Sequence, residues 1–170
     1  LDLLPRDIDI ESIFLEFLTT QVQGFYDSEI KVMNIISDSD ERDETLNILE
    51  NVTYAHEFVH ALQDQYFDID ALLNRIEETD NQDYALALRS LVEGDAQQVT
   101  FQYVLAMAQE DPGAISQLAE LEEDTIPDDI PDIIINELLY PYFEGHDFVR
   151  TLFNEGQWEQ VNQAYIDLPQ

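Results

Sequence analysis

Residues 54–69 read YAHEFVHALQDQYFDI, and this stretch decides how the rest of the chain is interpreted. His56 and His60 are four residues apart in the segment with the strongest helical pattern. In an α-helix that spacing puts both imidazoles on one face, one turn apart, where they can reach the same ion. Glu57 lies about 100° further round the helix, close to a metal-bound water and not on the metal itself. The stretch therefore predicts a zinc site of the H-E-x-x-H type, with Glu57 as the general base.

A catalytic zinc needs three protein ligands and an open position for water, so the third ligand must lie elsewhere in the chain. Glu93 is the strongest candidate, because it stands in an apolar helical stretch, SLVEGDAQQV (90–99). Burying a carboxylate there would be costly without a metal or another partner. The neighbouring Gly94 should cost about 1 kcal/mol of helix stability. A close approach to the helix of residues 54–69 would explain that cost.

Other interpretations of these carboxylates stay open. Glu93 could instead pair with Arg89, one helical turn earlier. Asp64 and Asp95 are the alternative metal ligands. Asp64 lies one turn past His60 on a similar face, and we prefer it as a partner for a histidine N–H, a role that Asp95 could also fill.

The remaining pattern predicts one mostly α-helical domain with a single small β-hairpin, that is, an α+β fold. Asp111-Pro112-Gly113 and Gly156 are the clearest helix-breaking signals. The hairpin has to pack against the helices, because two strands alone are only marginally stable. Helices are predicted over about 9–22, 43–66, 69–78, 82–110, 114–121, 141–154 and 156–166, and the hairpin over 25–36.

Composition excludes several classes of function. The chain has 38 acidic residues against six basic ones, a net charge of −32, and Lys31 is its only lysine. Nucleic acid is excluded as a partner, because phosphate contacts need Lys and Arg. Acidic residues spread along the whole chain indicate adaptation to concentrated salt, which screens their repulsion. With no cysteine, thiolate zinc sites and cysteine nucleophiles are excluded. No apolar run approaches the length of a transmembrane helix.

Two further segments carry weaker signals. The acidic segment 37–44 superficially resembles a calcium loop, but it lacks the glycine and distal Glu of an EF-hand, so a solvated loop is favoured. A hydrolytic zinc site also needs a donor for the developing oxyanion. Candidates are Tyr140, Tyr142 and His146 in LYPYFEGHDF (139–148). The alternative is that the tyrosines are core aromatics and that His146 lies on the surface.

HEFVH followed by a helix carrying a ligand Glu resembles the gluzincin group of zinc metallopeptidases. Longer runs are similar to a family of surface-associated proteins of archaea and bacteria, and the acidity resembles its haloarchaeal members. These runs are GFYDSEIKVMNI (24–35), YAHEFVHALQDQYFDI (54–69), LVEGDA (91–96) and YFEGHDFVRTLFNEGQWEQVNQAY (142–165). The resemblance implies one zincin-like domain over 1–170, excised from a longer protein, and an extracellular or cell-surface location.

The same resemblance bears on the details of the site. Gluzincins commonly carry an Asp four residues after the ligand Glu, where this chain has Gln97. The ligand-orienting carboxylate must therefore come from elsewhere, or an amide replaces it. The family architecture also implies that the hairpin strand at 30–36 could pair with an extended peptide.

Three functions are compatible with the sequence. The first is a zinc endopeptidase or related amide hydrolase, which acts on a peptide or protein substrate with Glu57 as base. The second is a metal-bound but catalytically idle cell-surface module that binds a partner or carbohydrate. The third is a helical cell-envelope domain without metal. The intact Glu57 favours the first, because an idle site has no need of a base.

Overall fold

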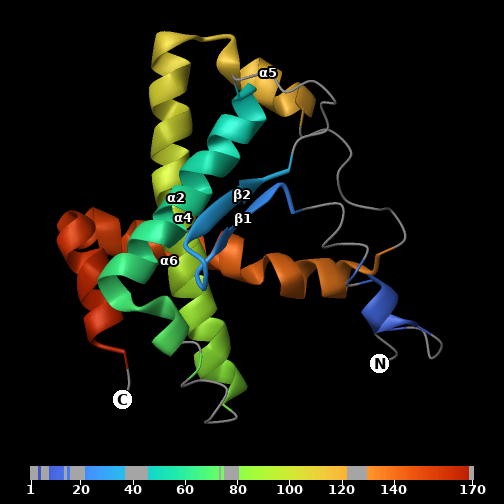
Figure 1. Cartoon of the computed structure of the whole chain (residues 1–170), viewed down its shortest axis with the longest axis vertical. Coiled ribbons are helices and arrows are strands. Elements are labelled where there is room, and N and C mark those ends of the chain that lie inside the picture. The colour runs from blue at the N-terminus through green and yellow to red at the C-terminus, as the bar shows by residue number, and fades with distance from the viewer. Residues whose placement is uncertain are drawn as a thin grey trace.

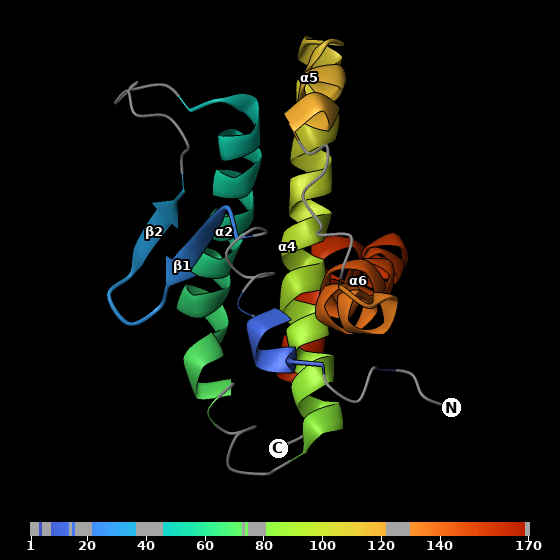
Figure 2. The same ribbon diagram turned by 90° about the vertical axis from the view of Figure 1, so that its right-hand side faces the viewer.

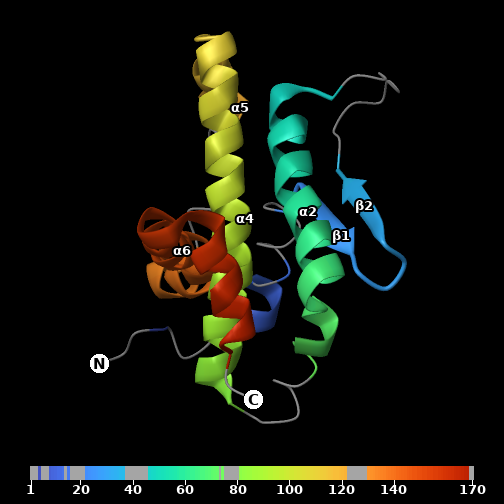
Figure 3. The same ribbon diagram turned by 90° about the vertical axis from the view of Figure 1, so that its left-hand side faces the viewer.

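The computed structural model describes residues 4, 8–13, 15, 22–36, 46–72, 74, 81–121 and 130–168. These residues are mostly helical with one two-stranded antiparallel sheet, which confirms the predicted α+β class. In chain order the elements are β1 (Gly24–Asp27), β2 (Val32–Ile35), α2 (Ile48–Phe67), α4 (Gln82–Glu110), α5 (Ala114–Leu121) and α6 (Asp132–Ile166). Figures 2 and 3 show them in layers: the hairpin lies outside α2, α2 lies beside α4, and α6 crosses the far side of α4.

Helix α2 carries the H-E-x-x-H segment, and a capping box defines where it starts. The Asn47 side chain accepts a hydrogen bond from the Glu50 amide, while the Glu50 carboxylate accepts one from the Asn47 amide. The predicted start at residue 43 is therefore wrong, because Asn47 is extended and stands outside the helix. The helix ends where Asp68 adopts a left-handed conformation. His56 and His60 thus lie in the regular middle of the helix.

Helix α4 spans the predicted range and, among the described elements, contributes the largest share of the buried apolar residues. The Asn81 side chain caps its first turn, and its regular geometry stops at Asp111. Leu88 is fully buried and Leu91 nearly so, in one cluster with residues of α6. This cluster fixes α4 as the central element against which the others pack.

Helix α6 differs from the prediction at its start and confirms it near its end. It begins at Asp132 and continues through Pro141, instead of starting at 141. Proline removes one helical hydrogen bond there without ending the helix. The predicted break at Gly156 is present, because Gly156 and Gln157 have non-helical backbone angles. Beyond the break the chain turns along α4 (Figures 1 and 3), and Tyr165 joins the core.

Two glycines set the contact between α4 and α6. A Cβ on Gly94 would lie 2.2 Å from the carbonyl carbon and oxygen of Gly145. A Cβ on Gly145 would lie 2.2 Å from the carbonyl oxygen of Ser90. The two backbones therefore touch directly. Gly94 approaches α6 and not α2, so the expected approach to the helix of His56 is wrong.

The hairpin is fixed to α2 through one buried carboxylate. Antiparallel pairing runs from Gly24–Ile35 to Asp27–Val32. Asp64 of α2 accepts hydrogen bonds from Tyr26 at 2.7 Å and from Lys31 at 2.6 Å. Asp64 is thus engaged by the hairpin, and its preferred role as partner of a histidine N–H is wrong.

Several predicted segments fall partly or wholly outside the described residues. The helix predicted over 9–22 is helical at 10–13 and 15, and the one over 69–78 at 69–72 and 74. The acidic segment 37–44 lies outside them entirely. None of the helices formed by the described residues is both long and apolar enough to cross a membrane.

Candidate metal centre

His56, His60 and Glu93 place three ligand atoms at nearly equal separations. The two Nε2 atoms are 3.1 Å apart, and Glu93 Oε2 lies 3.2 Å from His56 Nε2 and 3.4 Å from His60 Nε2. Around a tetrahedral zinc with bonds of about 2.0–2.1 Å, ligand atoms are about 3.3–3.4 Å apart. The three atoms therefore match the spacing of one face of a zinc tetrahedron.

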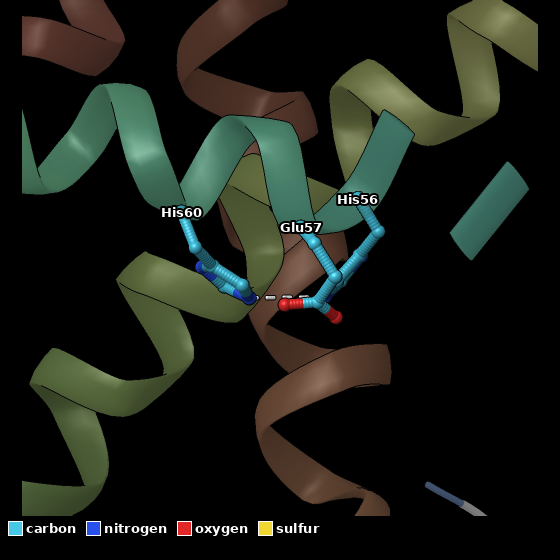
Figure 4. Close-up of side chains that lie close together, drawn as sticks. All are labelled: His56, Glu57 and His60. Atoms are coloured by element: carbon cyan, nitrogen blue, oxygen red, sulfur yellow. Dashed lines mark hydrogen bonds between the residues drawn. The ribbon is translucent and has the colours of Figure 1, made fainter. Parts of the chain in front are cut away.

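Glu57 completes the cluster from the same helix. Ligand atoms of His56, Glu57 and His60 all lie within 4.8 Å of one another. Figure 4 shows the three side chains extending from the same side of α2 toward a common point. Glu57 is buried, at 7% exposure. Its carboxylate thus lies beside the candidate ligand atoms of both histidines, where the predicted base is expected.

Glu93 and the two histidines stabilise each other's charged forms. Burial alone would raise the pKa of Glu93, but hydrogen bonds from His56 and His60 hold it well below the usual value. Burial would lower the pKa of His60, but the Glu93 carboxylate raises it above the usual value. Within the described residues the ion pairs of Glu93 are with these two histidines, and Arg89 takes no part in them. The alternative pairing with Arg89 is therefore wrong.

The Nδ1 atom of each histidine contacts a neutral side chain. Gln63 Oε1 is 2.9 Å from His60 Nδ1. Thr100 Oγ1 is 3.5 Å from His56 Nδ1, a long contact. The Thr100 hydroxyl donates to the Ala96 carbonyl at 2.8 Å, so its oxygen can only accept from the imidazole. Sequence reasoning missed both residues, although Gln63 follows His60 by three positions and shares its face of the helix.

Asp95 contacts the site indirectly. Its Oδ2 atom accepts hydrogen bonds from Gln63 Nε2 and from the Tyr165 hydroxyl, both at 2.9 Å. Asp95 therefore reaches His60 only through Gln63, and the partner of the histidine is an amide, one of the two alternatives that the sequence left open. Gln97, the position at which gluzincins carry an Asp, lines the neighbouring pocket.

A pocket of about 530 Å³ opens beside His56 and Glu57. Its walls come from α2, α4, α5, α6 and from Val22, Gln23 and Gly24 at the start of β1. Residues 30–36 do not line it, so the hairpin edge beside the site is that of β1 and not the strand at 30–36. Most of the remaining wall is apolar, including Leu49, Val52, Val104, Leu118, Leu139 and Phe143.

Tyr142 and His146 both reach this pocket, whereas Tyr140 lines a separate cavity. The Tyr142 ring stacks on His56, with 6.2 Å between ring centroids. Burial, followed by the charges of Glu93 and Glu57, raises the pKa of Tyr142, so its hydroxyl remains a donor. His146 Nε2 lies 2.9 Å from Gln98 Oε1, and burial lowers the pKa of His146, which favours the neutral ring.

Comparisons with protein-family models, with curated proteins and with solved structures find no match to this chain.

Proposed function

We propose that this domain is a zincin-like hydrolase that cleaves peptide or related amide bonds, with His56, His60 and Glu93 holding a zinc ion. The observation that supports this most directly is the triangle of ligand atoms with Glu57 beside it. A zinc ion at this position would polarise the scissile carbonyl and lower the pKa of a bound water toward about 7.

Glu57 acts as the general base in this proposal. It directly follows His56 on α2, and its carboxylate lies within 4.8 Å of the histidine ligand atoms. At that range it takes a proton from the attacking water and delivers it to the leaving amine. Its burial excludes competing solvent, which strengthens its interaction with the developing charges.

Tyr142 is the better placed of the two candidate oxyanion donors. It stacks on His56, keeps its proton and is hydrogen-bonded to Glu93 within the cluster, whereas His146 is hydrogen-bonded to Gln98. His146 then contributes to substrate positioning at the pocket wall. The apolar lining favours a substrate with a bulky apolar side chain next to the scissile bond.

The cell-surface location and the adaptation to high salt belong to the same proposal. Their support is the family resemblance together with the net charge of −32. The resemblance points to a substrate met outside the cell, and the charge points to a medium where salt screens the acidic surface.

The test is digestion of a defined peptide mixture by zinc-loaded protein in concentrated KCl, with cleavage products identified by mass spectrometry. Glu57→Gln is the matched control, because it preserves side-chain shape and the metal ligands. Cleavage by the wild type should fall by a factor of about 10²–10⁴ in the variant, at equal zinc content. A wild type that holds one zinc per chain and cleaves no peptide would refute hydrolysis and favour the idle binding module.

A further inference from the structure

Gln63 is a buried amide that makes contacts through both of its polar atoms. The residue is 2% exposed. Its Nε2 atom lies 2.9 Å from the Val92 carbonyl oxygen, 2.9 Å from Asp95 Oδ2 and 3.1 Å from the Tyr165 hydroxyl. Its Oε1 atom lies 2.9 Å from His60 Nδ1. The amide thus connects α4 and the end of α6 to a ligand histidine.

The chemistry of these neighbours fixes which way the amide faces. The Val92 carbonyl and the Asp95 carboxylate are acceptors, so each needs the NH₂ group of Gln63. A flipped amide would place its oxygen against two other oxygens in a buried site. The Gln63 oxygen must therefore face His60, and the proton between them must belong to His60 Nδ1.

The position of that proton decides whether the Nε2 atom of His60 has a free lone pair. A neutral imidazole carries one proton, so protonation at Nδ1 leaves the Nε2 lone pair free. Nε2 is the atom that lies 3.1 Å from His56 Nε2 and 3.4 Å from Glu93 Oε2. The required tautomer and the observed ligand triangle therefore agree.

Tyr165 positions the Asp95 carboxylate that accepts from the Gln63 amide. Its ring stacks on Phe67, with 4.1 Å between centroids, and its hydroxyl donates to Asp95 Oδ2 at 2.9 Å. Tyr165 reaches Asp95 only because α6 breaks at Gly156 and Gln157 and turns along α4. The Asp95 carboxylate is thus held in place to receive the Gln63 amide.

We infer that Gln63 is a positioning residue that fixes the Nδ1–H tautomer of His60, and that Asp95 and Tyr165 hold its amide in the orientation this requires. The inference rests on the proposed metal site and is independent of whether the domain hydrolyses peptides. Partners of ligand histidines typically change metal affinity by 10- to 100-fold when they are removed.

The test measures zinc affinity by competition with a chromophoric chelator for wild type, Gln63→Met and Gln98→Met. Gln98 is the matched control, because it is also a buried glutamine bonded to a histidine, but that histidine, His146, is not a ligand. Gln63→Met should weaken zinc binding by about 10- to 100-fold, and Gln98→Met should change it by less than about threefold. Equal affinity for wild type and Gln63→Met would overturn the inference.

Two further measurements keep the inference testable if Gln63→Met does not fold. Tyr165→Phe retains the ring on Phe67 and removes only the hydroxyl, and it should weaken zinc binding by about 3- to 10-fold. The chain has only three histidines, so ¹⁵N-labelled imidazole spectra of the zinc-loaded wild type can be assigned by substitution. They should show His60 protonated at Nδ1. Coordination through Nδ1 would overturn the inference, and a wild type that binds no zinc would overturn it together with the site.

Discussion

Replacing Gly94 by alanine should separate α4 from α6 next to Glu93, a proposed metal ligand. The added Cβ would lie 2.2 Å from the Gly145 carbonyl and 2.8 Å from the His146 amide nitrogen. Carbon atoms in favourable contact are about 3.5–4.0 Å apart, so the backbones must move by about 1 Å or more. Both sides of the contact are backbone, so no side-chain rotation can relieve it.

The expected cost follows from two opposing effects. Overpacking a core typically costs about 1–3 kcal/mol, and a contact between two backbones belongs at the upper end. Alanine gains about 1 kcal/mol over glycine in a helix interior. The net loss should be about 2 kcal/mol, which for a domain of this size lowers the melting temperature by about 4–8 °C. Zinc affinity should also fall, because Glu93 is the adjacent residue.

Thermal unfolding followed by circular dichroism in concentrated KCl, with chelator and again with saturating zinc, measures both effects. Gly113→Ala is the control, since the nearest atom to its Cβ would be Asp111 Oδ1 at 3.2 Å, the end of an exposed side chain. That variant should melt close to the wild type. If Gly94→Ala melts at or above the wild-type temperature, helix propensity outweighs the contact and the backbone crossing is not tight.

Three other perturbations test separate parts of the structure. Glu93→Ala should lose zinc, as should His60→Ala, because two protein ligands hold the ion poorly; full zinc occupancy by equilibrium dialysis in either variant would contradict the ligand set. Burial would raise the pKa of Asp64, but hydrogen bonds from Lys31 and Tyr26 lower it, so this stabilisation exists above the usual carboxyl pKa and disappears as the pH falls through the folded-state value. Lys31→Met should therefore destabilise the fold in urea at neutral pH and converge on the wild type in acid; a pH-independent difference would contradict this. Finally, the melting temperature with saturating zinc should rise strongly from about 0.1 M to about 2 M KCl, as the screening length shortens; a flat profile would exclude salt adaptation.

Local signals in the sequence predicted much of the fold. Helix α4 matched its predicted range because Asn81 and Asp111-Pro112-Gly113 mark its ends within a few residues. The start of α2 was placed too early, because the periodic pattern continues on the N-terminal side of Asn47, where the capping box starts the helix. The start of α6 was placed too late, because Pro141 is tolerated inside the helix.

The site divides in the same way between local and distant contributions. Spacing on one helix predicts that His56 and His60 share a face with Glu57 beside them, and the cost of a buried carboxylate points to Glu93. Tyr165 could not be predicted, because it reaches Leu91 and Asp95 across 74 and 70 residues of chain. That contact depends on how α6 turns after its break, which no nearby residue specifies.

The break in α6 also affects the order in which parts of the site can form during translation. Helices α2 and α4 leave the ribosome first, and they carry every proposed ligand of the ion. Tyr165 is synthesised 70 residues after Asp95, so Gln63 and Asp95 lack its support until the end of α6 docks. With the proposed zinc site, a nascent chain should therefore bind zinc weakly at first and tightly only once translation has passed residue 165. Metal supply during synthesis, and not only afterwards, would then influence how much of the protein reaches its final state.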